Sequence, residues 1–165
     1  MAATGGMVLF WPFIPGCDAS GTIVKIGPNA ISCIGHGCRI GDRVFGCTRV
    51  GAQGFTAWAE YFLFDADVCI PVPPSLSMPE AAGSGVGLLS AALGIFQCLG
   101  VDLVDPEKLL EKHGRDEWAL VFGGAGSVGQ FAVQLLGVAG FKVMATSSTK
   151  SFDVSVDVPV DFKLC

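Results

Sequence analysis

The chain has 165 residues, of which 51% are hydrophobic and 15% are charged. This apolar content supports a folded core and excludes intrinsic disorder, which requires low hydrophobicity and high charge. The net charge of -5 argues against nucleic-acid binding, because phosphate recognition needs a basic face. Glycine is abundant, with 23 residues, but it has no three-residue period, which excludes a collagen-like chain.

The cellular location is predicted from features that the sequence lacks. The longest uncharged run, Ala81 to Val101, is interrupted by glycines and polar residues and has no flanking basic cluster, so we do not expect a transmembrane helix. The stretch from Met1 to Phe13 contains no Lys or Arg and does not look like a secretory signal. The seven cysteines form no CxxC pair, which favours reduced thiols and a cytoplasmic protein.

The first 74 residues predict short strands separated by glycine-rich turns. Gly21 to Ile26 is a β-branched run closed by a Gly-Pro-Asn turn, and Arg43 to Thr48 is a second run of strand length. Ala57 to Pro71 alternates loosely between apolar and polar residues. Together these runs predict a small β-barrel or sandwich.

Beyond Pro74 the pattern changes to alternating helices and strands. A capping box begins at Ser77 and predicts one helix that reaches about Leu99 and is buried on both faces. The charged stretch from Asp102 to Asp116 is expected to form an exposed insert, with a short helix near residues 106–110.

A β–α–β unit is predicted next in the chain. Trp118 to Phe122 is an apolar run of strand length, Ser127 to Ala139 has helical spacing, and Phe141 to Thr146 is the following strand. Gly140 is suited to end the helix. The predicted fold class is α/β, with a partial β-barrel domain over residues 1–74 and a partial doubly wound nucleotide-binding domain over residues 75–165.

The turn after the first of these strands fits the pattern G-x-G-x-x-G. It consists of Gly124, Ala125, Gly126, Ser127, Val128 and Gly129. In a dinucleotide-binding turn the first glycine permits the tight bend, the second lets the backbone approach a diphosphate, and the third lets helix and strand pack closely. Free N–H groups and the helix dipole then favour the diphosphate. The alternative is a glycine-rich turn of an ordinary α/β fold.

The end of the second strand indicates which cofactor binds. An NAD site usually has Asp or Glu there for the ribose hydroxyls. This chain instead has Ser147, Ser148, Thr149 and Lys150, whose hydroxyls and positive charge suit a 2′-phosphate. The sequence therefore predicts NADP rather than NAD, the alternative being a solvated loop without an acid.

Two cysteine-containing stretches offer donors that a metal could use, but neither predicts a metal site. The spacing of Cys33, His36 and Cys38 fits no common zinc pattern. Cys17 next to Asp18 is expected to be a core cysteine at a strand edge. No Ser-His-Asp or Cys-His arrangement stands out, so the catalytic residues stay unassigned.

The order of these motifs resembles the medium-chain dehydrogenase/reductase superfamily. Residues 15–21 (PGCDASG) followed by 41–44 (GDRV) resemble its GroES-like domain, and residues 57–61, 70–76 and 80–82 resemble the passage into its cofactor domain. Residues 85–92 and 123–129 continue the likeness. Within the superfamily, the chain is most similar to the fungal trans-acting enoyl reductases of polyketide pathways, over roughly residues 14–153.

The resemblance implies a zinc-free NADPH-dependent reductase that transfers hydride to an activated C=C bond of a thioester, free or carrier-bound, with a polyketide synthase as a possible partner. It places Gly87, Leu88 and Ser90 by the nicotinamide and substrate, Ala125 to Val128 at the diphosphate, and Ser148 to Ser151 at the 2′-phosphate. Zinc alcohol dehydrogenases have a Gly-His-Glu motif where this chain has Gly16, Cys17 and Asp18. The nucleotide motifs fit a quinone oxidoreductase equally well.

The chain departs from the family at both ends. Members are about twice as long, and residues 1–13 look unrelated to their first strands. The chain stops soon after the second strand of the expected nucleotide-binding sheet, and residues 154–165 do not show the helix expected there. We therefore keep the alternative of a truncated remnant without catalytic activity, whose sheet would expose apolar surface.

Overall fold

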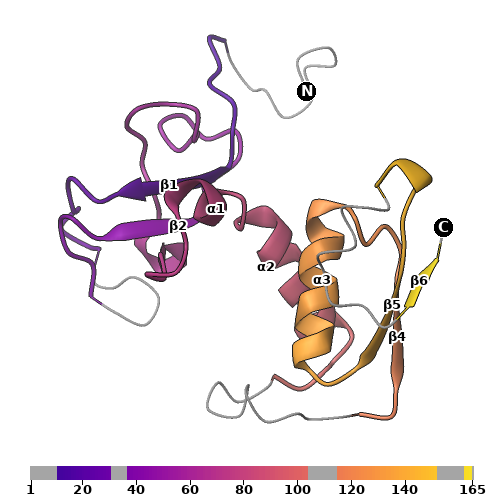
Figure 1. The fold of residues 1–165 in the computed structure, drawn as a ribbon. Coiled ribbons are helices and arrows are strands. Elements are labelled where there is room, and N and C mark those ends of the chain that lie inside the picture. Colours follow the sequence, from indigo (N-terminus) through magenta and orange to yellow (C-terminus); the bar gives the residue numbers. More distant parts are fainter. Residues whose placement is uncertain (1–10, 31–36, 104–114, 152–161, 165) are drawn as a thin grey trace. The chain divides into compact units, whose positions relative to one another are not determined.

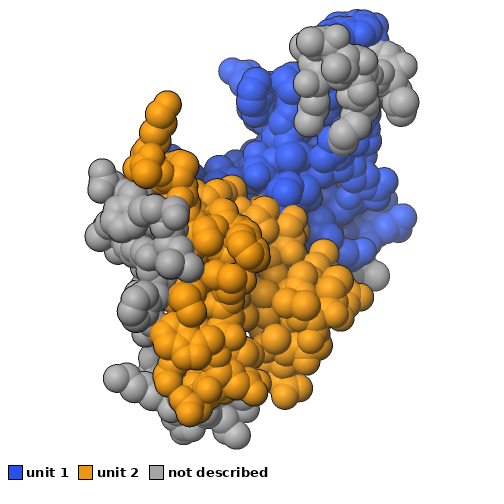
Figure 2. Space-filling model, turned by 90° about the vertical axis from the view of Figure 1, so that its right-hand side faces the viewer, with its two compact units in different colours: residues 1–86 blue, residues 87–165 orange. Residues whose placement is uncertain are grey.

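The computed structural model describes residues 11–30, 37–103, 115–151 and 162–164. The chain forms two compact units, residues 1–86 and 87–165, which Figure 2 shows in different colours. Each unit has its own sheet and its own buried apolar cluster. The predicted α/β fold class is confirmed, while the domain boundary after residue 74 stays a prediction.

The first unit contains a three-stranded antiparallel sheet in the order β1-β2-β3 (Figure 1). Its strands are β1 (Asp18–Thr22), β2 (Arg43–Cys47) and β3 (Ile70–Pro71). The predicted second strand is confirmed, but β1 begins three residues before the predicted start at Gly21. The apolar pattern misses this start because the first residues of the strand include polar ones. Ser20, for example, is held by a hydrogen bond of 2.7 Å that its hydroxyl donates to the carbonyl of Met78.

The alternation predicted for residues 57–71 does not form a long strand. Apart from β3, its regular structure is the short 3-10 helix η1 (Ala66–Val68). Trp58, Tyr61 and Leu63 are all exposed, so the apolar positions do not define a buried face. The Leu63 N–H donates instead to the Gly54 carbonyl at 2.7 Å, which holds the segment as a loop against a preceding turn.

A capping box starts the first helix, α1 (Met78–Ala82), at the predicted place. The Ser77 hydroxyl accepts from the Glu80 N–H at 3.4 Å, and the Glu80 carboxylate accepts from the Ser77 N–H at 2.8 Å. The Ser77 hydroxyl also donates to that carboxylate at 2.6 Å. These bonds, the hydroxyl bond first, hold the pKa of Glu80 below its ordinary value.

The single long helix predicted from this start is wrong, because α1 ends before Gly83. A second helix, α2 (Val86–Ala92), follows and passes into the π-helix η2 (Leu93–Cys98). The break has a local cause. The carboxylate of Asp18 accepts from the Val86 N–H at 2.7 Å and provides a new helix start. Leu93 is exposed, so the helical segment is not buried on both faces.

The second unit contains the predicted β–α–β arrangement (Figure 1). Strand β4 (Trp118–Val121) pairs in parallel with β5 (Lys142–Thr146), and α3 (Ser127–Val138) connects them. Gly140, with φ of +92°, follows the helix as predicted. The expectation of only two strands is wrong, because β6 (Phe162–Leu164) pairs in parallel with β5 and extends the sheet.

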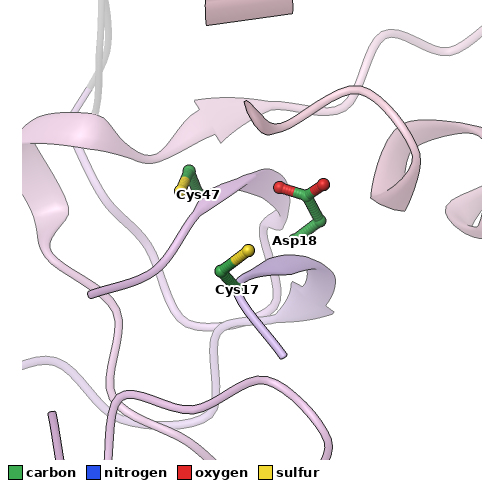
Figure 3. Close-up of side chains that lie close together, drawn as sticks. All are labelled: Cys17, Asp18 and Cys47. Atoms are coloured by element: carbon green, nitrogen blue, oxygen red, sulfur yellow. The ribbon is translucent and has the colours of Figure 1, made fainter. Parts of the chain in front are cut away.

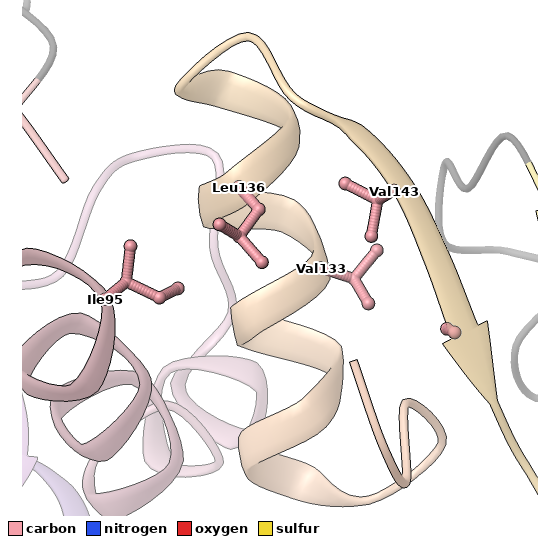
Figure 4. Close-up of a cluster of buried hydrophobic side chains, with 5 residues drawn as sticks. Ile95, Val133, Leu136 and Val143 are labelled. Atoms are coloured by element: carbon pink, nitrogen blue, oxygen red, sulfur yellow. The ribbon is translucent and has the colours of Figure 1, made fainter. Parts of the chain in front are cut away.

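The core of the second unit lies between α3, η2 and one face of the sheet (Figure 4). Val133 and Leu136 of α3 meet Val143 and Ala145 of β5, with Ile95 of η2 on the other side of the helix. Val133 and Val143 are each 1% exposed. Helical spacing on α3 and alternation on β5 therefore produce the buried face that the sequence pattern predicts.

Two further expectations concern the cysteines and the membrane. Cys38 is disulfide-bonded, so the prediction of reduced thiols is wrong for this residue. The remaining described cysteines, Cys17, Cys47, Cys69 and Cys98, are free. Along the part of the chain that the structure describes, no helix combines the length and apolar character needed to cross a bilayer. The predicted short helix at residues 106–110, and both Cys33 and His36, lie outside the described residues.

Candidate functional site

The glycine turn is fastened to the carboxyl end of the neighbouring strand. Gly123 follows β4 with φ of +72°, a conformation that favours glycine. Its N–H donates to the Thr146 hydroxyl at 3.0 Å, and the Gly124 N–H donates to the Thr146 carbonyl at 2.8 Å. The turn is thus held at the end of β5, where the predicted 2′-phosphate loop begins.

Close packing explains two of the three motif glycines. A side chain at Gly124 would lie 2.6 Å from the Ala145 methyl group, and one at Gly129 would collide with the Gly123 carbonyl. Both glycines are buried. Gly126 differs, because it is exposed and a Cβ there would meet only the Gly123 carbonyl, at 3.3 Å. The turn therefore needs Gly124 and Gly129 for its own packing, and Gly126 leaves the outer surface clear of a side chain.

The amino end of α3 is open toward solvent. Gly126 is its N-cap residue, in extended conformation, and no side chain of the described residues caps the first turn. Ser127 and Val128 are exposed. The shape of the turn is maintained from inside, because the Gln130 side-chain amide donates to the Ala125 carbonyl at 2.9 Å. Uncapped helix N–H groups and the positive end of the helix dipole provide a favourable environment for an anion.

The segment after β5 displays hydroxyls and one cation. Ser147 and Ser148 lead into the 3-10 helix η4 (Thr149–Ser151). The Ser148 hydroxyl donates to the Ser151 hydroxyl at 3.1 Å, which joins the two ends of this loop. Lys150 is exposed, and residues 146–151 contain no acid. The loop could therefore accept a phosphate without repulsion from a carboxylate of its own.

The structure brings one of the three predicted substrate residues against the glycine turn. Gly87 of α2 is buried, and a Cβ there would lie 2.5 Å from the Ser127 hydroxyl and 3.0 Å from the Phe131 ring. Leu88 is half-buried and Ser90 is exposed on the same helix. Sequence reasoning missed Thr146, although a hydroxyl residue at the end of the second strand was the available signal.

A second group of polar side chains lies in the first unit, and Figure 3 shows it. Single ligand atoms of Cys17, Asp18 and Cys47 all lie within 4.8 Å of one another; we name these three residues the Cys17 cluster. Asp18 and Cys47 are register partners in the β1–β2 pair. Burial raises the pKa of the Cys47 thiol, and the neighbouring Cys17 and Asp18 raise it further. Sequence reasoning considered Cys17 and Asp18 but missed Cys47, which joins them only through strand pairing.

The model of the alcohol dehydrogenase GroES-like domain matches residues 1–74. The chain is 34% identical over 146 residues to the trans-enoyl reductase buaC of Petromyces alliaceus, covering 84% of this chain and 38% of that protein. It is 37% identical over 143 residues to the trans-enoyl reductase traG of Penicillium crustosum, covering 86% of this chain and 39% of that protein. The chain thus spans about two fifths of the length of these curated relatives.

Solved structures share the fold. An alcohol dehydrogenase superfamily protein from Novosphingobium aromaticivorans superposes with a TM-score of 0.74 at 25% identity, over 99% of this chain and 44% of that one. A mycobacterial protein in complex with NADPH superposes with a TM-score of 0.65 at 25% identity, over 90% of this chain and 40% of that one. A mycobacterial quinone oxidoreductase superposes with a TM-score of 0.73 at 26% identity, over 98% of this chain and 44% of that one.

Proposed function

Because the chain belongs to the medium-chain dehydrogenase/reductase superfamily, we propose that its protein is an NADPH-dependent enoyl reductase. The substrate would be an α,β-unsaturated thioester, free or carrier-bound, in a polyketide pathway whose synthase is the partner, and the protein would act in the cytoplasm. Relatives named trans-enoyl reductases support this reaction class.

One observation carries the proposal. The glycine turn, held by Thr146, leads into the uncapped and exposed amino end of α3. Residues Ala125 to Val128 would hold the diphosphate there through backbone N–H groups, without a side chain at Gly126 in the way. A structural neighbour in complex with NADPH supports binding of a nicotinamide coenzyme.

The preference for NADPH is inferred from the loop after β5. Ser148, Thr149 and Lys150 are exposed and carry two hydroxyls and one positive charge, with Ser147 and Ser151 alongside. A 2′-phosphate gains charge-assisted hydrogen bonds from such a loop, whereas a free ribose hydroxyl gains much less. NADPH, when bound, supplies the hydride for the β-carbon of the C=C bond, and Gly87, Leu88 and Ser90 of α2 would border the substrate.

A quinone oxidoreductase is the second candidate, since a mycobacterial protein of that name shares the fold at 26% identity. The same coenzyme site would serve both reactions. Comparing turnover of a crotonyl-type thioester with turnover of a quinone by the whole protein separates the two, and a preference for the quinone would replace the first proposal.

The coenzyme part is tested by fluorescence titration of the 165-residue chain with NADPH and NADH. We expect tighter binding of NADPH, and the Lys150→Ala change should weaken it about tenfold, or about 1.4 kcal/mol. Lys142→Ala is the matched control, because it removes the same charge from a lysine paired with Asp116 at 2.6 Å. Equal affinities for the two coenzymes would refute the NADP preference, and absence of binding would refute the site.

A further inference from the structure

The Cys17 cluster places two sulfurs and one carboxylate together on neighbouring strands. The three side chains are half-buried, and their ligand atoms lie within 4.8 Å of one another (Figure 3). Both thiols are free. No part of the proposed reduction uses these groups, and all three belong to the first unit.

We propose that the Cys17 cluster binds a divalent metal ion of the zinc type through both sulfurs and one Asp18 oxygen, with water as the fourth ligand. Thiolate sulfur and carboxylate oxygen are donors that Zn²⁺ accepts in tetrahedral sites. Thiolates also exclude hard ions such as Mg²⁺ and Ca²⁺, which require oxygen donors. Binding releases the two thiol protons, and the ion then offsets the negative charges of the two thiolates and the carboxylate.

The observed spacing is close to that of a filled site. Bond lengths of about 2.3 Å for Zn–S and 2.0–2.2 Å for Zn–O place tetrahedral ligands roughly 3.5–3.8 Å apart. From separations of up to 4.8 Å, the cluster therefore needs to contract by up to about 1.3 Å, which side-chain rotation can supply. Deprotonation of Cys47 would also end the 3.4 Å hydrogen bond that its thiol donates to the Thr48 carbonyl.

Backbone contacts fix the positions of the three donors. Asp18 and Cys47 are paired across β1 and β2, and the Thr48 N–H donates to the Cys17 carbonyl at 2.7 Å. One carboxylate oxygen of Asp18 accepts from the Val86 N–H at 2.7 Å, which leaves the other oxygen for the ion. Hydrogen bonds of this kind orient metal ligands and strengthen binding.

A disulfide between Cys17 and Cys47 is the competing use of the same thiols. The first unit contains a disulfide at Cys38, yet Cys17 and Cys47 are free. A disulfide also makes no use of the carboxylate, whereas a cation is stabilised by it. These two observations favour the metal ion.

The test uses the full chain, reduced with a phosphine and kept free of oxygen. Titration with Co²⁺ should produce thiolate-to-cobalt charge-transfer absorption that Zn²⁺ abolishes, and desalted protein should retain one Zn²⁺. Cys47→Ser should lower Zn²⁺ affinity by tenfold or more, and Asp18→Asn should lower it while keeping an oxygen for the Val86 N–H. Cys98→Ser and Cys38→Ser are the controls and should bind as the unaltered chain does.

Zinc should also raise the Tm of the unaltered chain but not that of the Cys47→Ser variant. Retention of zinc by Cys47→Ser, or its loss in Cys38→Ser, would overturn the proposal. A Cys17–Cys47 disulfide that persists in the phosphine and leaves the chain without metal would also overturn it. Circular dichroism identifies a variant that has lost its fold, and Asp18→Asn then decides. Nucleotide titration is a separate readout, so failure here leaves the proposed function untouched.

Discussion

The two units are built from contacts of different range along the chain. In the second unit, β4, α3 and β5 follow one another within residues 118–146, and their apolar side chains form one buried cluster. In the first unit, Thr22 pairs with Arg43 and Val44 with Pro71, and the buried cluster among its described residues consists of Val44 and Cys69 with partly buried neighbours. Local sequence patterns therefore determine the second unit, while the first depends on individual long-range bonds.

The sharpest test of the second unit is Gly129→Ala. The new methyl group would collide with the Gly123 carbonyl and lie 2.8 Å from the Gly124 Cα, so the turn must open. We expect NADPH binding to fall by more than about 100-fold, or about 2.7 kcal/mol, measured by fluorescence titration. Gly137→Ala on the same helix is the control, since its methyl group meets nothing within 4 Å. Unchanged binding by Gly129→Ala would contradict the described turn.

The two units should also differ in how fast their cysteines react with an alkylating reagent. Burial, and secondarily Asp65, raise the pKa of Cys69 in the first unit to about 11. Its thiolate population near neutral pH is then roughly 100-fold lower than that of an ordinary thiol. Cys98 of the second unit is exposed. We expect iodoacetamide to modify Cys98 long before Cys69, as followed by peptide mass spectrometry, and comparable rates would show that the first unit opens readily.

Removing core volume tests the apolar cluster of the second unit. Leu136 is 7% exposed and packs against β5, so Leu136→Ala should lower the free energy of unfolding by about 2–4 kcal/mol. Val138→Ala changes an exposed residue two positions away and should have little effect. Hydrogen exchange should show faster opening of β5 and α3 in the first variant. Similar effects of the two substitutions would mean that the cluster does not support this unit.

The smallest expected effect concerns the helix start in the first unit. Ser77→Ala removes the N-cap and should lower the free energy of unfolding by about 1 kcal/mol, while the exposed neighbouring Ser75→Ala should not. Because the folded state lowers the pKa of Glu80, the stabilisation is present above the ordinary Glu pKa and is lost as pH falls through the folded value. Unfolding measured across acidic pH should show this loss. Ser77→Ala should reduce it, because the Ser77 N–H still donates to the Glu80 carboxylate.

How much of the structure the sequence predicts depends on whether the contacts involved are local or far apart along the chain. The sequence predicts the β–α–β unit, its glycine turn and the capping box at Ser77 well, because each depends on residues that lie close together along the chain. The start of β1 and the break after α1 are missed, since both depend on polar side chains that bond to backbone far along the chain. Cys47 is missed for the same reason, because only strand pairing brings it to Asp18.

The bond from the Val86 N–H to Asp18 has a consequence for engineering. The acceptor for the first N–H of α2 lies 68 positions earlier in the chain, on strand β1. A chimera that takes its helical segment from one homologue and its early strand from another would separate donor from acceptor, even with every helix residue preserved. Grafting experiments on this protein therefore have to transfer both segments as one module.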